Sequence, residues 1–243
     1  MFSRIPKAHP ARVRPRITEE QLACTMPITV ILVDDHAVLR DGMRALLDAN
    51  TNVKVVGAAA NGRDAIVLSR ELTPDVVVMD ITMPQLNGID ATVEILRDSP
   101  GTRIVVLSMH VDSEHVCLAL KAGARGYLSK ESAGHLVCEA VETVATGQRY
   151  LCPHTSRVMI DDYVSVPGSD GHVSPLDQLS SRERQVLQLV VEGRTSARIA
   201  KTLSLSPKTV ETYRHRIMQK LDIGDLPALV RFAIRQGLTP LDL

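Results

Sequence analysis

The first half of the chain contains a set of polar side chains that could together carry out phosphoryl chemistry. They are three carboxylates, a hydroxyl and an amine, each at or just past the end of an apolar run: Asp34, Asp35, Asp80, Ser108 and Lys130. Three crowded carboxylates repel one another, by about 4 kcal/mol per pair at ~4 Å in a medium of effective dielectric ~20. A Mg²⁺ ion would relieve this repulsion, because it binds one or two carboxylates together with other oxygens and water.

With such a metal in place, one carboxylate could attack a phosphorus atom and hold the phosphoryl group as an acyl phosphate. The metal and Lys130 would neutralise the phosphoryl oxygens, and the Ser108 hydroxyl could donate to one of them. Taken singly, each residue has an ordinary explanation, such as a helix N-cap for Asp34 or a solvated charge for Lys130. The matching residue types at successive strand ends make chance a poor explanation of the whole set.

The elements that must position these residues form a repeating pattern of strand and helix. Short apolar, β-branched runs are typical of strands buried on both faces, and they cover residues 29–33, 53–56, 75–79, 103–107 and, more briefly, 125–128. Helical apolar spacing fills the segments between them. This alternation predicts an α/β fold, a doubly wound (βα)5 parallel sheet. Its ligand crevice would lie at the carboxyl ends of the strands, where the polar set converges.

Length and charge indicate a second domain with a different task. The 243 residues suit two modest domains, and the net charge of zero conceals a division along the chain. Residues 27–174 contain 12 Lys or Arg against 19 Asp or Glu, whereas residues 175–243 contain 11 against 7. An acidic middle joined to a basic end suggests that the end binds a polyanion. Aromatic residues are only 2%, which argues against stacking on single-stranded nucleic acid.

The apolar runs, the N-terminal stretch and the cysteines indicate in which cellular compartment the protein resides. No apolar run approaches the ~18 residues that a membrane span needs, and the basic start lacks the ~7–15-residue apolar stretch of a secretory signal. The four cysteines show no CxxC spacing, which favours reduced thiols in the cytoplasm. We therefore expect a cytoplasmic protein with no membrane partner. Residues 1–26 form a basic, disordered arm that could touch DNA phosphates, or else residues 1–25 are an upstream mis-start, because Met26 is itself a natural start for the domain that follows.

The basic end predicts a small bundle of four helices. Ser180 and Glu183 have capping-box spacing before an apolar run, and Gly193 ends that helix. A short helix over residues 195–203 follows. Ser206 and Pro207 then begin a helix that runs to about residue 221, and a fourth helix covers residues 225–235. Two short helices joined by a tight turn, the second basic, describe a helix-turn-helix.

The helix that begins at Ser206 has one apolar and one polar side. The polar side and its flanks carry residue types that contact DNA phosphates and base edges: Lys208, Thr209, Glu211, Thr212, His215, Arg216 and Gln219. An ordinary amphipathic helix with a solvated face explains this helix about equally well on its own. Arg214 points toward the inner side, where we expect it to pair with Glu183.

The strand-end residues occur within motifs that resemble the receiver domain of bacterial two-component response regulators. The motifs are VDDH at 33–36, PDVVVMDITMP at 74–84, GI at 88–89, LSMH at 107–110 and GARGYLSK at 123–130. The resemblance implies that Asp80 is the phosphoacceptor and that Asp34, Asp35, Asp80 and the backbone of Thr82 hold Mg²⁺. It also implies that Ser108 and Tyr127 are the switch residues and that Lys130 contacts the phosphoryl group. Phosphorylation would draw Ser108 inward, and Tyr127 would then become buried.

The basic end resembles a LuxR-type DNA-binding domain over residues 176–241. The motifs are SSRERQVL at 180–187, IA at 199–200, LSPKTVET at 205–212 and KL at 220–221. A receiver over residues 27–147, a linker over 148–175 and this domain resemble a NarL/FixJ-type response regulator. The resemblance implies a transcription regulator rather than an enzyme. Its expected partners are a histidine kinase, promoter DNA and a second copy of the chain, with RNA polymerase as a further candidate.

Two other functions use the same features. A Mg²⁺-dependent phosphotransferase or phosphatase could use the aspartate cluster, but it would need a general acid or base, which the predicted crevice does not evidently offer. A constitutive or small-molecule-controlled DNA-binding factor would need no phosphorylation, and the intact set of five residues weighs against it.

Overall fold

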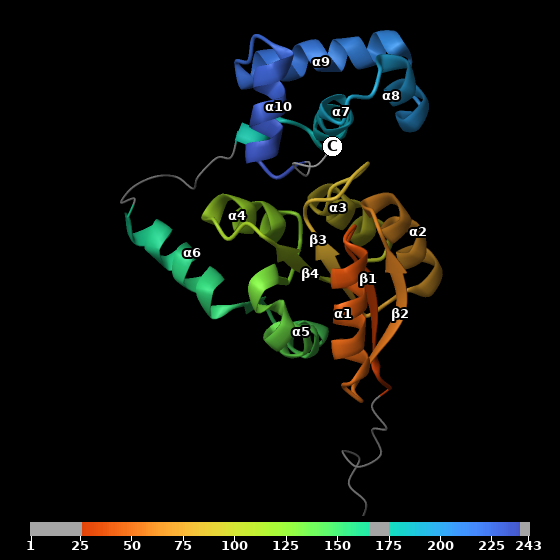
Figure 1. The fold of residues 1–243 in the computed structure, drawn as a ribbon, viewed down its shortest axis with the longest axis vertical. Helices are drawn as coiled ribbons and strands as arrows, with labels where there is room; N and C mark the ends of the chain where they lie inside the picture. Colours follow the sequence, from red (N-terminus) through yellow and green to blue (C-terminus); the bar gives the residue numbers. More distant parts are fainter. Residues whose placement is uncertain (1–25, 166–174, 239–243) are drawn as a thin grey trace, which may run out of the picture.

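The computed structural model describes residues 26–165 and 175–238, which form an α/β domain and a helical domain (Figure 1). Within these residues the α/β domain is built on one six-stranded parallel sheet, with the strand order β2-β1-β3-β4-β5-β6. The strands are β1 (Ile28–Val33), β2 (Val53–Ala59), β3 (Val76–Asp80), β4 (Arg103–Ser108), β5 (Gly126–Ser129) and β6 (Tyr150–Leu151).

Helices cover both faces of this sheet. The helices of this domain are α1 (Ala37–Asp48), α2 (Gly62–Leu72), α3 (Gly88–Asp98), α4 (Ser113–Lys121), α5 (Lys130–Ala145) and α6 (Pro153–Ser165). Alternate strand residues point to opposite faces, so Val30 and Leu32 of β1 pack toward α1 and α5, while Ile31 and Val33 pack toward α2 and α3. The predicted doubly wound fold is confirmed. Among the described residues, no helix is both long and apolar enough to cross a membrane.

The region after α5 is more regular than the sequence predicts. The predicted linker over residues 148–175 contains β6, which pairs with β5, and α6, which packs on α4 and β5. A strand of two residues is too short to show a pattern, and α6 begins at Pro153, a residue that favours a first helical turn. The (βα)5 prediction therefore missed one strand and one helix, and α6 includes residues 163–165, for which we expected no helix. Residues 166–174 lie outside the described residues.

The order of the strands brings the carboxyl ends of β1 and β3 together. From β1 the chain crosses to β2 on one side and then to β3 on the other, so β1 and β3 are neighbours at the switch point of the sheet. Asp34 directly follows β1, and Asp80 ends β3. Ligands of open α/β sheets bind at this point, because the connections diverge and leave a crevice.

A close backbone contact fixes the chain just beyond Asp80. A Cβ atom added to Gly88, the first residue of α3, would lie 2.0 Å from the carbonyl oxygen of Asp80. The Gly88 amide also donates to the carbonyl of Ile81 at 2.8 Å. The start of α3 is therefore packed against the backbone of the strand end.

We expect Gly88→Ala to lower the free energy of unfolding by about 3 kcal/mol, because the backbone of Asp80 must move to admit the methyl group. The control is Gly42→Ala inside α1, where an added Cβ meets nothing within 4 Å. That change should stabilise the chain by up to about 1 kcal/mol. Urea unfolding of both variants measures the difference, and equal stabilities would contradict the contact.

The helical domain follows the sequence prediction closely. Its elements are the 3₁₀ turn η2 (Pro175–Gln178) and the helices α7 (Ser181–Val191), α8 (Ser196–Leu203), α9 (Pro207–Leu221) and α10 (Leu226–Arg235). Ser180 and Glu183 form the predicted capping box of α7, and Ser206 caps α9 ahead of Pro207. The apolar sides of the helices form one core. The predicted four-helix domain with a helix-turn-helix is confirmed.

The expected pairing of Glu183 with Arg214 is wrong. Lys220 makes the ion pair instead, with its Nζ 2.7 Å from Glu183 Oε2. Arg214 donates to the hydroxyl of Ser196 at 3.3 Å and to Glu211 at 3.2 Å. The start of α7 is thus within reach of the last turn of α9, whereas Arg214 lies closer to the start of α8.

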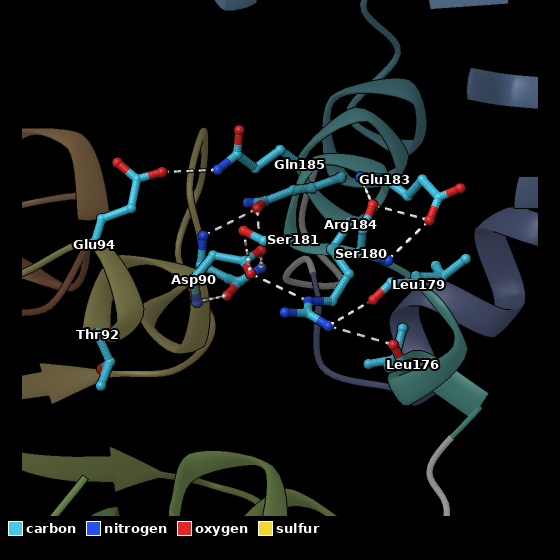
Figure 2. Close-up of polar contacts among 12 residues, drawn as sticks. Asp90, Thr92, Glu94, Leu176, Leu179, Ser180, Ser181, Glu183, Arg184 and Gln185 are labelled. Atoms are coloured by element: carbon cyan, nitrogen blue, oxygen red, sulfur yellow. Dashed lines mark hydrogen bonds and ion pairs between the residues drawn. The ribbon is translucent and has the colours of Figure 1, made fainter. Parts of the chain in front are cut away.

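The helical domain packs on the α/β domain through polar side chains of α7 (Figure 2). The fully buried Asp90 of α3 accepts from Arg184 Nε at 3.1 Å and from the Ser181 hydroxyl at 3.3 Å. One turn of α3 later, Glu94 accepts from the side-chain amide of Gln185 at 2.9 Å. Burial raises the pKa of Asp90, although Arg184 opposes the shift.

A second contact joins α4 to the end of α10 through a buried histidine. The carboxylate of Asp112 lies 2.8 Å from His115 Nδ1, and the carbonyl of Gln236 lies 3.1 Å from His115 Nε2. The ring of His110 stacks on that of His115, with centroids 4.7 Å apart. Burial lowers the pKa of His115, but Asp112, the Gln236 carbonyl and the charge of Glu114 outweigh burial and leave that pKa raised.

A raised pKa means that His115 stabilises the folded state most below its ordinary value of 6.5, and that this contribution is lost as the pH rises through the raised value. We therefore expect the difference in free energy of unfolding between wild type and His115→Gln to be largest at about pH 5.5 and to shrink by about pH 9. His135→Gln, on the exposed side of α5, is the control. A difference that stays constant with pH would contradict the protonated bridge.

Candidate functional site

The predicted acidic set does meet at the carboxyl edge of the sheet. Lys130 Nζ lies 2.9 Å from Asp34 Oδ2 and 2.8 Å from Asp80 Oδ2, so one amine bridges two carboxylates. The side chains of Asp34, Asp80 and Lys130 are only 3%, 2% and 7% exposed. Asp35 lies beside them and is less buried. The first residue of α5 and the ends of β1 and β3 therefore build one buried, charged pocket.

Burial disfavours the charged forms of Asp80 and Lys130, and the opposite charges of their neighbours oppose this effect. Burial raises the pKa of Asp80 to about 7, with Lys130 opposing the shift and Asp34 adding to it. The backbone amide of Thr82 donates to Asp80 Oδ1 at 3.3 Å and also favours the charged form. Burial lowers the pKa of Lys130, but the two aspartates outweigh it and the pKa is raised. Lys130 is thus held as a cation against the carboxylate that would react.

The donor atoms of the pocket fit a hard divalent cation. Carboxylate oxygens of Asp34, Asp35 and Asp80 and a ring nitrogen of His36 lie within 4.8 Å of one another. Asp34 Oδ2 and Asp35 Oδ1 are each contacted by one basic group, Lys130 Nζ at 2.9 Å and His36 Nδ1 at 2.8 Å. Carboxylate oxygens gathered in this way are the hard ligands that Mg²⁺ prefers.

Two residues of this site carried no assigned role in the sequence analysis. His36 contacts both acidic neighbours, and Arg40 donates from Nη1 to the carbonyl of Asp34 at 2.6 Å. Arg40 lies on α1, six residues after Asp34, where the helix turns back over the strand end. The position of His36 after two aspartates was visible in the sequence, whereas the contact of Arg40 depends on the direction of α1.

Ser108 and Tyr127, the two predicted switch residues, both form hydrogen bonds with the backbone of His110. The hydroxyl of Ser108 accepts from the backbone amide of His110 at 2.9 Å, and the hydroxyl of Tyr127 donates to the carbonyl of His110 at 2.6 Å. The side chain of Tyr127 is fully buried. Its ring packs in the core under α4, and the burial of this ring in response to phosphorylation stays a prediction.

The predicted DNA-contacting residues all lie on α9, and most are exposed. Lys208, Thr212, His215, Arg216 and Gln219 are open to solvent. A groove of about 320 Å³ runs beside them, lined by Ser206, Lys208, Thr209, Thr212, Tyr213 and Arg216. In Figure 1, α9 lies on the side of the helical domain that is far from the α/β domain, whereas α7 and α10 lie nearer to it.

Two residues of the α9 set are already bound to neighbours within the domain. Thr209 is half-buried, and its hydroxyl lies 2.8 Å from that of the capping Ser206. Glu211 accepts from the hydroxyl of Ser196 and from Arg214 at 3.2 Å. Both side chains are therefore partly committed to holding α8 and α9 in place.

Comparisons with known proteins find a match for each of the two domains. The response regulator receiver domain matches residues 30–142, and the luxR family of bacterial regulatory proteins matches residues 177–233. The response regulator UvrY of Escherichia coli (strain K12) is 38% identical over 211 residues, which are 87% of this chain and 95% of UvrY. The response regulator GacA of Pseudomonas protegens is 37% identical over 216 residues, 89% of this chain and all of GacA.

Solved structures give the same result. A LuxR-family response regulator from Aurantimonas sp. SI85-9A1 has a TM-score of 0.56 and 36% identity, over 57% of this chain and 99% of that one. The response regulator RcsB, solved in complex with DNA, has a TM-score of 0.53 and 26% identity, over 85% of this chain and 98% of RcsB. The chain therefore belongs to the NarL/FixJ family of two-component response regulators and regulates transcription by binding DNA through a LuxR-type domain.

Proposed function

We propose that Asp80 is the phosphoacceptor that controls this regulator. The supporting observation is the buried pocket in which Lys130 bridges Asp80 and Asp34. An oxygen of Asp80 would attack the phosphorus of a phosphohistidine on a histidine kinase, forming the P–O bond as the P–N bond breaks. Lys130 would then leave the carboxylate to bind the phosphoryl oxygens, and the Ser108 hydroxyl would donate to one of them.

The carboxylates of Asp34, Asp35 and Asp80 and the backbone carbonyl of Thr82 would hold Mg²⁺. When bound, the ion neutralises charge on the carboxylates and on the incoming phosphoryl oxygens. The close grouping of the carboxylate oxygens, which lie within 4.8 Å of one another, supports this ligand set. His36 would lie beside it and contact Asp35. The chain's own task is to hold these oxygens close together against their mutual repulsion.

Phosphorylation of Asp80 would change the rest of the receiver domain through Ser108. A phosphoryl group on Asp80 would accept the hydrogen bond that the Ser108 hydroxyl donates and draw Ser108 toward it, while the same hydroxyl also accepts from the amide of His110. Because Tyr127 holds the carbonyl of the same residue, we propose that the backbone at His110 moves rather than the buried ring. The resulting change in the receiver would favour a homodimer. Two tethered DNA-binding units gain avidity of ~10²–10⁴ over one unit.

The exposed side of α9 would enter the major groove of promoter DNA. Lys208 and Arg216 would bind phosphates, and Thr212, His215 and Gln219 would reach base edges. Thr209 and Glu211 would act at the same surface while they support the turn between α8 and α9. The relatives named above are regulators, and we propose that this chain likewise has no catalytic turnover of its own.

We expect Asp80→Asn to fold normally and to lose all increase in DNA affinity on treatment with acetyl phosphate and Mg²⁺, because its amide cannot form the acyl phosphate. The exposed Asp41→Asn variant on α1 is the control and should respond like wild type. Gel-shift titration with and without acetyl phosphate measures the response. An Asp80→Asn variant that still responds, or release of more than one phosphate per chain from a phosphomonoester, would overturn the proposal.

We expect Lys208→Ala to weaken DNA binding to about the same extent on every sequence and to reduce the slope of log affinity against log salt by about 1, because one phosphate contact is lost. Lys54→Ala, which removes an exposed lysine from β2, serves as the control. The measurement is fluorescence anisotropy with labelled duplex at several salt concentrations. An unchanged salt slope would exclude Lys208 from the interface.

A further inference from the structure

We propose that Gln188 and Glu192 of the DNA-binding domain are positioning residues for the metal site of the receiver. They contact the loop between β3 and α3, residues 81–87, which contains Thr82. The inference rests on the proposed role of the Thr82 carbonyl as a metal ligand. Its consequence is that the DNA-binding domain, while it is docked, helps to build the phosphorylation site.

Gln188 binds both ends of the loop. Its side-chain nitrogen donates to the carbonyl of Met83 at 2.7 Å, and its side-chain oxygen accepts from the backbone amide of Asn87 at 2.9 Å. Gln188 is fully buried, so water does not compete for these bonds. A single side chain of α7 thereby fixes the distance between the start and the end of the loop.

Glu192 holds the middle of the loop in an unfavourable backbone conformation. Its carboxylate accepts from the amide of Gln85 at 2.8 Å, and Gln85 has a φ of +69°. A left-handed conformation costs a non-glycine residue ~1–2 kcal/mol, and the hydrogen bond from the Gln85 amide to Glu192 helps to offset this cost. The Glu192 side chain is only 3% exposed and is itself bound by Arg194 at 3.3 Å and by Gln188 at 3.1 Å.

Thr82 links the loop to both the pocket and the docked domain. Its backbone amide donates to Asp80 Oδ1 at 3.3 Å, and its hydroxyl donates to the carbonyl of Gly237 at 3.1 Å. The residue that would present its carbonyl to the metal is therefore fixed on one side by the phosphoacceptor and on the other by the segment that follows α10.

These contacts order the loop before any metal binds. Met83, Gln85 and Asn87 use side chains of the other domain to satisfy backbone polar groups, which buried structure requires. An ordered loop loses less conformational freedom when the metal binds, so docking should strengthen metal binding. Linkage is reciprocal, so the metal should equally strengthen docking. This route between the domains does not pass through Ser108 or Tyr127.

The test is to measure metal affinity of full-length variants without any phosphodonor. Electron paramagnetic resonance counts free Mn²⁺, a divalent ion that carboxylate and carbonyl sites also bind. We expect Gln188→Ala to weaken Mn²⁺ binding by about 3–10-fold, since its two loop bonds are lost. Gln185→Ala is the matched control, because it removes a hydrogen bond between the same helix and α3 that does not involve the loop. It should stay within about twofold of wild type.

A second pair of variants tests the inference independently, in case Gln188→Ala does not fold. Glu192→Gln keeps an acceptor for the Gln85 amide and should retain wild-type affinity for Mn²⁺, whereas Glu192→Ala should weaken binding. The inference would be overturned if Gln188→Ala and Glu192→Ala bound Mn²⁺ with the affinity of wild type. It would also be overturned if Gln185→Ala lost as much Mn²⁺ affinity as Gln188→Ala. Because no phosphoryl group is involved, a chain that binds Mn²⁺ as expected but takes no label from acetyl phosphate would refute the proposed function instead.

Discussion

The structure depends on burying Asp34, Asp80 and Lys130 together at the carboxyl edge of the sheet. Transfer of each charge from water costs several kcal/mol, and the geometry with one amine between two carboxylates recovers part of this cost. Compensation is incomplete, because burial still raises the pKa of Asp80 to about 7. A cation or a phosphoryl group entering here therefore changes the balance of charge in the whole pocket, which suits a site that must respond to a small chemical change.

The docking of the two domains combines polar contacts with an apolar one, in which Leu118 of α4 and Ile89 of α3 pack on the core of the helical domain. Arg184 and Asp90 form a buried ion pair, and His115 bridges Asp112 to the backbone of Gln236. A buried ion pair contributes little net stability, but removing one partner leaves a charge that is costly to bury. Interfaces of this kind resemble transient protein contacts more than obligate ones, so they can open when their electrostatic balance changes.

Features that follow from the order of elements along the chain could be predicted from the sequence. Contacts that depend on where two helices cross in space could not. Asp34, Asp80 and Lys130 could be placed together because parallel strands end at one edge, and the caps at Ser180 and Ser206 are local patterns. The pairing of Lys220 with Glu183 depends on where α9 crosses α7, which no local spacing encodes. Likewise, Arg184, Gln185 and Gln188 on α7 have the composition of a solvated face, and only the docked arrangement shows that they contact the receiver.

The orientation of α9 limits how phosphorylation can control DNA binding. The receiver contacts α7 and the end of α10, while Lys208, His215 and Gln219 of α9 stay exposed, so docking does not cover the proposed DNA-contacting face. The proposed control by phosphorylation would then act on the arrangement of two copies rather than on access to one. Helix-turn-helix dimers bind half-sites about 34–36 Å apart, which is one turn of DNA. A domain held rigidly against its receiver inherits the geometry of the receiver dimer, so the contacts of α7 with the β3–α3 loop would help to set that spacing.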